Sequence, residues 1–382
     1  MSELSYLEKL LDGVKVEWKT LEKVLKRTKG TKITAGQMKA LHKDNAPLKI
    51  FAGGKTVAFV DFKDIPEKDI NREPSIIVKS RGIIEFEYYD KPFSHKNEMW
   101  SYHSNNDAIS IKYIYYFLKI NEGYFQKIGG KMQMPQIATP DTDKFEVPIP
   151  CPDNPEKSLA IQSEIVRILD KFTALTAELT AELNMRKKQY NYYRDQLLNL
   201  EGRENTREMR IGDIYDFQYG TGNTIPKSGG QYPVYGSNGI VGSHDKYNSE
   251  DSPVIGHIGA YAGIVNWGQG KHFVTYNGVI CRHKSKEVLQ KYAYYLLLLQ
   301  DFGSKSNSAS QPFVSYNILN APIVLVPPLQ EQARIVAILD KFDTLTNSIT
   351  EGLPREIELR QKQYEYYRDL LLSFPKPETV SN

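Results

Sequence analysis

The sequence predicts an α+β chain in which two strand-rich globular blocks alternate with two long helices. The first observation behind this fold class is a repeat: the stretch RKKQYNYYRD at 186–195 returns almost unchanged as RQKQYEYYRD at 360–369. The second is the coiled-coil spacing of apolar residues around both copies. The third is that the segments between them hold short β-branched runs broken by Gly, Pro, Asn and Asp, which is typical of strands and turns. The chain is therefore built as a duplication, block–helix–block–helix.

The first long helix is expected over 154–203, with Asn154 as its cap and Pro155 at its first position. The second is expected over 327–376, where Pro327 and Pro328 precede the first turn and Pro375 ends the helix. In both copies the apolar residues alternate spacings of three and four, which is the seam of a coiled coil. The seam residues are Ile161, Ile165, Ile168, Phe172, Leu175 and Leu179, then Ile335, Ile338, Phe342, Leu345 and Ile349.

The second helical copy is four residues longer than the first. The first reads TAELTAEL at 176–183, and the second reads TNSITEGLPREI at 346–357. Four residues are slightly more than one helical turn, so such an insertion keeps the apolar stripe nearly in phase and lengthens a helix by about 6 Å. Gly352 and Pro354 lie inside the longer copy, however, and whether they bend this helix stays open.

The two globular blocks are expected over 1–153 and 204–326, and a short tail follows at 377–382. They resemble each other in layout. KIFAGGKTVAFVD at 49–61 corresponds to PVYGSNGIVGSHD at 233–245, and PSIIVKSRGIIEFEYYDKPF at 74–93 to SPVIGHIGAYAGIVNWGQGKHF at 252–273. Each block then continues with a short aromatic helix, a polar loop and an apolar strand. Two α+β domains of the same architecture are predicted.

This layout, together with the paired ILDKF…LT starts, the TAELTAEL tetrads and the paired KQYxYYRD ends, resembles the specificity (S) subunit of type I restriction–modification enzymes. The resemblance covers essentially the whole chain. It implies that each block is a target-recognition domain for one half of a split sequence in double-stranded DNA. It also implies that the helices form an antiparallel coiled coil, with pseudo-twofold symmetry, that fixes the gap between the halves. The subunit would be non-catalytic and would hold two adenine-methylating (M) subunits, which restriction (R) subunits join.

Sequence motifs for catalysis, cofactors and metals do not occur. There is no NPPY-like adenine methyltransferase motif, and AGGKT at 52–56 fails the phosphate-loop pattern because its first glycine would fall at Lys49. Gly256, Gly259 and Gly263 have the wrong spacing for a dinucleotide site. The histidines lack metal-ligand spacing, and the two cysteines, Cys151 and Cys281, are expected to be inert packing residues. We therefore expect no enzyme activity, no cofactor and no metal.

Polar residues of the predicted loops are the candidates for DNA contact, because Arg and Lys suit guanine, Asn and Gln suit adenine, and cations or hydroxyls suit phosphate. The first block supplies Lys79, Ser80, Arg81, His95, Lys96, Asn97, Lys131, Gln133 and Gln136. The second block supplies Ser237, Asn238, His257, Tyr261, Lys271, His272, Ser310 and Gln311. Any one of these residues could instead be an ordinary loop side chain. Taken together, they predict a basic face on each block.

The duplicated decamers predict a docking surface for two copies of one partner, since a repeated helix implies a repeated contact. Tyr190 and Tyr193 continue the apolar stripe in the first copy, and the cations project from other helix faces. Tyr364 and Tyr367 continue it in the second copy. An open alternative is a solvated coiled-coil surface whose tyrosines only pack, and both descriptions can hold at once. The candidate docking residues are Arg186, Lys187, Lys188, Arg194, Arg360, Lys362 and Arg368.

The net charge of +3 says little about partners, but its distribution is uneven, with seven lysines and arginines against two acids over 15–32. No stretch is long and apolar enough for a membrane span, so a cytoplasmic protein is expected. The main alternative function is a coiled-coil scaffold whose globular blocks bind proteins. Binding to DNA should weaken steeply as salt rises, which would separate the two functions.

Overall fold

The computed structural model describes residues 6–130, 133–306, 312–348 and 350–376. The chain divides into two compact units. Unit 1 comprises Met1–Glu178 and Ile357–Asn382, and unit 2 comprises Leu179–Glu356. Each unit therefore contains one globular block together with parts of the long helices, and each is described here by itself.

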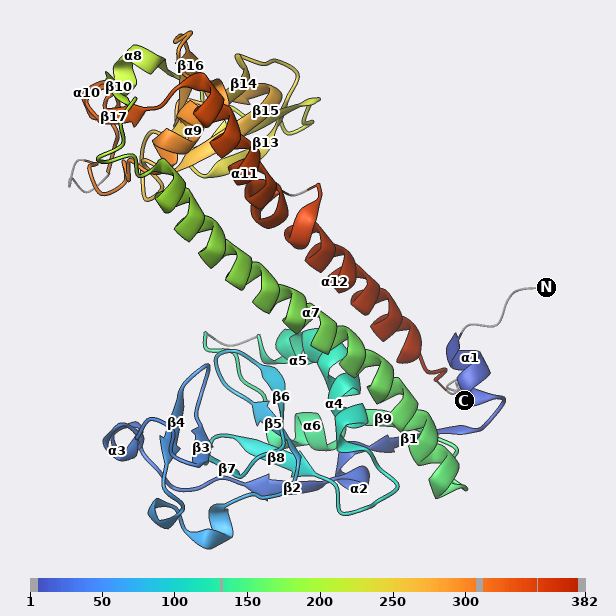
Figure 1. Cartoon of the computed structure of the whole chain (residues 1–382). Helices are drawn as coiled ribbons and strands as arrows, with labels where there is room; N and C mark the ends of the chain where they lie inside the picture. The colour runs from blue at the N-terminus through green and yellow to red at the C-terminus, as the bar shows by residue number, and fades with distance from the viewer. Residues whose placement is uncertain (1–5, 131–132, 307–311, 349, 377–382) are drawn as a thin grey trace. The chain divides into compact units, whose positions relative to one another are not determined.

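The globular part of unit 1 is a mixed α+β domain (Figure 1). A two-stranded ribbon, β1-β9, joins its two ends, a four-stranded sheet has the order β2-β8-β5-β6, and a three-stranded sheet has the order β4-β3-β7. Its strands are β1 (Val16–Thr20), β2 (Lys26–Lys29), β3 (Leu48–Phe51), β4 (Val57–Val60), β5 (Ser75–Lys79), β6 (Glu85–Tyr89), β7 (Phe93–His95), β8 (Trp100–His103) and β9 (Glu146–Pro150). Its helices are α1 (Tyr6–Leu11), α2 (Leu21–Val24), α3 (Ala35–Leu41), α4 (Ile111–Ile120), α5 (Glu122–Gly129) and α6 (Thr139–Asp143), with 3-10 turns at Phe62–Asp64 and Glu67–Asp69.

The globular part of unit 2 repeats this plan. The ribbon β10-β17 corresponds to β1-β9, and one six-stranded sheet has the order β11-β16-β14-β15-β12-β13. Its strands are β10 (Arg207–Arg210), β11 (Tyr215–Tyr219), β12 (Tyr232–Gly236), β13 (Gly239–His244), β14 (Ser249–Gly256), β15 (Val265–Val274), β16 (Gly278–His283) and β17 (Ile323–Val326). Its short helices are α8 (Ile211–Ile214), α9 (Gln290–Leu298) and α10 (Tyr316–Asn320).

One sheet in unit 2 replaces two sheets in unit 1 because a single long strand, β15, makes both kinds of pairing that β6 and β7 make separately in unit 1. In unit 1 the segment Asp90–Pro92 separates these two strands, and the proline lacks the N–H that a ladder needs. The parallel pairing is nevertheless the same in both units: Phe51 pairs with His95, and Tyr235 pairs with Val274. The predicted correspondence of the two blocks is thus confirmed at the level of strand pairing.

The first long helix is α7 (Pro155–Leu198), one continuous helix of 44 residues. The second predicted helix is in fact two, α11 (Leu329–Asn347) and α12 (Gly352–Leu371). Gly352 has φ +75°, and a Cβ there would lie 2.4 Å from the carbonyl oxygen of Thr344, so the chain packs tightly against the end of α11. The expectation that the four additional residues simply lengthen a helix is therefore wrong, because they fall at this break. Ile349, a predicted seam residue, lies outside the described residues.

Reciprocal aromatic contacts join the helical copies within each unit. In unit 1, Phe172 of α7 stacks on Tyr367 of α12 with ring centroids 5.4 Å apart. In unit 2, Tyr193 of α7 stacks on Phe342 of α11 with centroids 5.6 Å apart. Because Phe172 and Phe342 occupy equivalent positions of the repeat, as do Tyr193 and Tyr367, each copy gives its phenylalanine to the tyrosine of the other. The partner's residue number falls as the number along α7 rises, which is the antiparallel pairing that the resemblance implies.

Each helix start is fastened to its globular block by a buried glutamine and an aspartate. In unit 1 the Gln162 amide accepts from the Ser110 N–H at 2.9 Å and donates to the Ala108 carbonyl at 3.0 Å. Asp170, two turns later, accepts a hydrogen bond of 2.5 Å from the Tyr116 hydroxyl of α4, and Lys112 Nζ lies 2.7 Å away. Figure 1 shows α4 beside the N-terminal part of α7. These contacts fix the block to the helix that follows it.

Unit 2 uses the same residue types at the equivalent positions. Gln332 accepts from the Leu289 N–H at 2.8 Å and donates to the carbonyl groups of Glu287 and Pro327 at 3.0 and 2.8 Å. Asp340 accepts a hydrogen bond of 2.5 Å from the Tyr295 hydroxyl of α9. Both glutamines have no exposed surface, so their amide groups depend on these partners.

Candidate nucleic-acid interface

In unit 1 the segment after β5, which carries Ser80 and Arg81, lies against the closing loop, which carries Gln136. The Gly82 N–H donates to the Pro135 carbonyl at 2.8 Å, and the Ile137 N–H donates to the Ser80 carbonyl at 3.0 Å. Between these two bonds the Arg81 guanidinium donates from Nε and Nη2 to Oε1 of Gln136, at 3.2 and 3.0 Å. Arg81 is exposed, whereas the Ser80 side chain is buried and donates to the Glu98 carbonyl at 2.6 Å. The structure thus brings Arg81 and Gln136 together at the surface, with Ser80 beneath them.

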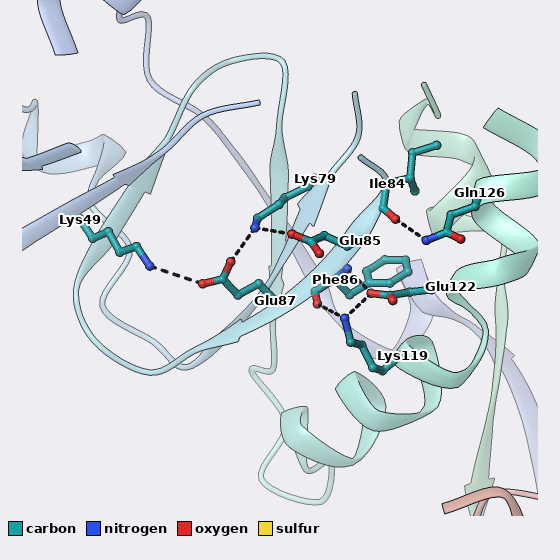
Figure 2. A network of polar contacts seen from close by, with 9 residues as sticks. All are labelled: Lys49, Lys79, Ile84, Glu85, Phe86, Glu87, Lys119, Glu122 and Gln126. Atoms are coloured by element: carbon teal, nitrogen blue, oxygen red, sulfur yellow. Dashed lines mark hydrogen bonds and ion pairs between the residues drawn. The ribbon is translucent and has the colours of Figure 1, made fainter. Parts of the chain in front are cut away.

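Lys79 is a supporting residue and not an exposed cation. Its Nζ lies 2.5 Å from Glu85 and 2.8 Å from Glu87 on the neighbouring strand β6, and Glu87 also reaches Lys49 at 3.4 Å (Figure 2). Burial by itself would lower the pKa of Lys79, but hydrogen bonds from its ammonium to the two carboxylates more than offset this and raise the pKa above its ordinary value. Lys79, a predicted DNA contact, therefore lies buried with its charge enclosed by two acids, whereas the prediction places it in an accessible loop.

His95 is also buried, with no exposed surface, and its Nε2 lies 3.1 Å from the Ser101 hydroxyl. Burial lowers the pKa of this imidazole to about 4, so it is neutral at physiological pH. Lys96 pairs with Glu98 at 2.7 Å, and Asn97 is exposed. The Asn97 amide lies within hydrogen-bond reach of the Gly30 and Thr31 carbonyl groups through its nitrogen. Of these three candidates, only Lys96 and Asn97 lie where a ligand could reach them.

A cavity of about 890 Å³ opens beside Asn97. Its basic lining is mostly the lysine- and arginine-rich segment noted in the sequence, and two acids, Asp64 and Asp69, also line it. The polar and basic lining residues that sequence reasoning did not select as site residues include Arg27, Lys29, Lys32, Gln37, Lys68 and Thr139. Three of them, Arg27, Lys29 and Lys32, lie in the basic segment 15–32, whose uneven charge could have indicated them. Nothing in the sequence could show that Lys68 and Thr139 join the same cavity.

In unit 2 the equivalent segments meet in the same way. The Gly259 N–H donates to the Pro312 carbonyl at 2.8 Å, and the Val314 N–H donates to the His257 carbonyl at 2.9 Å. Ile258 and Phe313 form an isolated bridge, as Arg81 and Gln136 do in unit 1. The backbone geometry of the two candidate faces is therefore the same, although the side chains differ.

The His257 side chain is nearly buried and belongs to an aromatic stack. Its ring lies 4.1 Å from that of Tyr219, which in turn stacks on Tyr316 at 4.2 Å, and its Nδ1 lies 3.0 Å from the Tyr276 carbonyl oxygen. Tyr276 and Tyr316 are 47% and 37% exposed, so this stack reaches the surface. The aromatic partners were not selected from the sequence, because they come from three separate segments.

Three of the selected residues, Ser237, Asn238 and Tyr261, line one cavity of about 450 Å³ in unit 2. Lys271 and His272 do not join them. Lys271 lies over the Tyr247 ring at 4.7 Å, and His272 has no exposed surface. Both residues pair with the start of β14, whereas the cavity and His257 lie at its other end. Gln133 is exposed on the closing loop of unit 1, while Lys131, Ser310 and Gln311 lie outside the described residues.

The cations of the two decamers are mostly engaged within their own helices. Arg186 pairs with Glu182 at 2.7 Å, Lys362 pairs with Glu358 at 2.5 Å, and Arg360 donates to Gln363 at 2.7 Å. Arg194 and Arg368 each pair with the following aspartate and lie over Tyr190 and Tyr364, both at 5.8 Å. Lys187 and Lys188 are exposed.

Two tyrosines of the decamers that the sequence analysis did not single out are also exposed. Tyr192 is 62% exposed, and its equivalent, Tyr366, is 65% exposed. Large exposed aromatic side chains are common anchors of protein interfaces. A repeated pair of equal exposure therefore adds to the candidate docking surface.

Within residues 6–130, 133–306, 312–348 and 350–376, no group of three or more metal-ligating side chains is assembled. None of the helices in the described part of the chain is long and apolar enough to span a bilayer.

Comparisons with known proteins agree on one family. The family model described as "Type I restriction modification DNA specificity domain" matches residues 15–186 and 203–359. The specificity subunit of the type I restriction enzyme EcoR124I/EcoR124II of Escherichia coli is 40% identical over the full length of both chains. The EcoprrI specificity subunit, also of E. coli, is 37% identical over 92% of this chain and 93% of its own.

A crystal structure of a type I restriction–modification S subunit from M. genitalium shares the fold. Its TM-score is 0.67 over 96% of this chain and 98% of that one, at 17% sequence identity. The two matched segments of the family model cover both globular blocks and most of the long helices. The chain therefore belongs to the family of type I restriction–modification specificity subunits.

Proposed function

We propose that this chain is the non-catalytic DNA-recognition subunit of a type I restriction–modification complex. Each globular block reads one half of a bipartite target in double-stranded DNA, and the antiparallel helices set the gap between the halves. The observation that carries the proposal is the duplicated surface loop: the Ser80–Gly82 and His257–Gly259 segments are held by equivalent backbone bonds to their closing loops. A split target needs two such readers on one chain.

The attachment of each block to its helix supports the idea of a fixed gap. A block that could swing on its helix would accept several gaps, because the two readers would not hold one separation. The buried Gln162 and Gln332 and the Asp170 and Asp340 contacts restrict that motion in each unit. For this role we assign the blocks to 1–153 and 204–326, and the helical segments to 154–203 and 327–376.

The repeated decamers support the proposed binding of partner subunits. Two copies of the exposed tyrosine, with neighbouring cations, suit two identical methyltransferase (M) subunits, and restriction (R) subunits would join that complex. The M subunits would supply S-adenosylmethionine binding and the methyl transfer. A role on chromosomal DNA places the chain in the cytoplasm.

The test is an adenine-methylation map of a host that expresses this chain with its M subunits, compared with a host that expresses the M subunits alone. We expect one bipartite motif that depends on this chain. Methylation that is absent, or confined to an undivided motif, would refute the proposed function. The scaffold alternative predicts instead that the chain retains its partners at high salt and leaves the map unchanged, whereas DNA binding should fall steeply as salt rises.

A change in the length of α7 should change the gap and leave both half-sites as they are. Deleting Thr180–Leu183 shortens the helix by about 6 Å at 1.5 Å per residue. That length is close to two base-pair steps at about 3.4 Å each. The methylation map of the deletion variant should show the same half-sites at a gap altered by one or two base pairs. The substitution Thr180→Ala changes the same tetrad without changing its length and should leave the gap unaltered. A changed half-site with an unchanged gap would contradict the ruler role.

A further inference from the structure

Equivalent backbone bonds make the two candidate faces comparable position by position. Gly82 and Gly259 bond to Pro135 and Pro312, while Ser80 and His257 accept from Ile137 and Val314. The start of the blocks aligns in the same way, since the Thr31 N–H bonds to the His95 carbonyl and the Thr221 N–H to the Val274 carbonyl. Because the backbone is equivalent, a different side chain at one of these positions means that the two blocks present different chemical groups at the same place.

The first block carries polar and basic groups at these positions. They are Lys29, Arg81, Asn97, Gln136 and Thr139. Lys29, Asn97 and Thr139 line the same cavity, and Arg81 and Gln136 are bonded to each other.

The second block carries aromatic or apolar groups at the same five positions. They are Tyr219, Ile258, Tyr276, Phe313 and Tyr316. Three of these rings lie in the stack around His257, and the Tyr316 hydroxyl accepts a hydrogen bond from the Tyr219 N–H at 3.0 Å. None of the five side chains can offer a guanidinium or amide fork.

We propose that the two blocks read their half-sites by different chemistry: Arg81, oriented by Gln136, reads a guanine, and the aromatic face around Tyr219 and Tyr316 reads thymine methyl groups. This inference rests on the proposed function, since it names the specificity of the same two faces. It goes further in predicting which half-site contains the guanine that is read by hydrogen bonds.

The geometry of Arg81 fits guanine. Oε1 of Gln136 accepts hydrogen bonds from Nε and from one hydrogen of Nη2. The far end of the guanidinium, which carries both hydrogens of Nη1 and the second hydrogen of Nη2, can still donate to a ligand. Guanine presents two acceptors, O6 and N7, in the major groove, and a guanidinium fork matches them. Fixing the planar group beforehand also reduces the ordering cost of binding. The nearby Glu98 carboxylate is paired with Lys96 at 2.7 Å.

The second face fits a base that is distinguished by an apolar group. Thymine carries a C5 methyl in the major groove, and side chains such as alanine, threonine or phenylalanine recognise it by contact. The exposed edges of Tyr276 and Tyr316, together with Ile258 and Phe313, provide such a surface. A guanine read by a fork would leave its acceptors without partners on this face, which would cost binding free energy.

The test uses the assembled complex of this chain with its M subunits and synthetic duplexes that carry the mapped target. In one half-site, guanine is replaced by 7-deazaguanine, which removes the N7 acceptor, and in the other, thymine is replaced by uracil, which removes only the methyl. We expect 7-deazaguanine to lower the methylation rate about 10-fold or more at one position of the first block's half-site. Uracil should lower it about 3- to 5-fold in the second half-site, from the loss of one buried methyl.

The variant Arg81→Ala identifies which half-site belongs to the first block. It should accept all four bases at the guanine position and become insensitive to 7-deazaguanine there, while the other half-site and the gap stay unchanged. Arg81→Lys keeps the charge but not the fork and should also lose much of the guanine preference. Because Arg81 is exposed, neither change should unfold the chain.

The inference is overturned if the Arg81 variants relax no guanine, or if uracil has the same effect in both half-sites. Either result would leave the proposed function standing, provided that the wild-type complex methylates a bipartite motif. A wild-type complex without such a motif would refute both.

Discussion

Alanine at Gly30 or Gly220 should destabilise its unit by about 3 kcal/mol or more, among the larger effects available to a single methyl group. A Cβ at Gly30 would lie 2.3 Å from the Lys96 carbonyl oxygen, and a Cβ at Gly220 would lie 2.1 Å from that of Thr275. These neighbours are backbone atoms of the segments that follow β7 and β15, so they cannot move aside as a flexible side chain would. The two glycines let the chain that follows β2 and β11 pass close to the segment that carries Lys96 and Asn97 or its equivalent.

Thermal and denaturant unfolding of the purified chain would measure this effect. For a unit of this size, about 3 kcal/mol corresponds to a fall in melting temperature of roughly 10 °C. Gly53→Ala is the matched control, because a Cβ there meets no atom within 4 Å. If Gly30→Ala and Gly53→Ala unfolded alike, the close approach of the two backbone segments would be refuted.

Replacing Gln162 or Gln332 with leucine should lower the free energy of unfolding by about 4 kcal/mol. It should also widen the range of gaps that the complex accepts between half-sites. Each amide satisfies one backbone N–H and at least one backbone carbonyl in a site without exposed surface. Leucine has a similar size but no polar atoms, so these backbone groups would remain buried without partners, at about 1–3 kcal/mol each. The block would then be held less firmly on its helix.

Two measurements separate stability from function in this case. Denaturant unfolding gives the loss of free energy, and a methylation map of the assembled complex gives the range of accepted gaps. Gln330→Leu, an exposed position on the same helix as Gln332, should change neither quantity. Gln162→Leu or Gln332→Leu at near wild-type stability would contradict the assigned role of these amides. A destabilised variant that keeps a single gap would show that the aspartate contacts are sufficient.

The histidine and lysine candidates show that the burial of a polar side chain was not evident from the sequence. His95, His272 and Lys79 looked like loop residues suited to DNA, yet all three lie in strands and are buried. Strands as short as β7, with three residues, give no usable alternation of polar and apolar residues. Lys79 ends a strand that is buried at every position, and it is tolerated there only because two glutamates of β6 enclose it. Pairing with a distant strand decides such burial.

Arg81 and Gln136 show the opposite case, because both were selected and the structure places them together. They are 55 residues apart in the chain, so their hydrogen bonds depend on the closing loop returning to β5. The aromatic stack of unit 2 forms only because the segments of Tyr219, His257 and Tyr316 meet in the folded chain, and no local sequence pattern indicates it. Sequence reasoning therefore found single loops and missed combinations of segments.

The sequence by itself determined the duplicated plan, the two helical copies and the start of each helix, since these depend on spacing and capping within a few turns. Only the tertiary structure decided that the longer copy is broken before Gly352, and that each copy's phenylalanine meets the other's tyrosine. It alone also decided which polar residues of the blocks reach the surface. The physical reason is range: a helix is encoded by neighbours three and four residues apart, whereas burial and pairing depend on segments that meet only after the chain has folded.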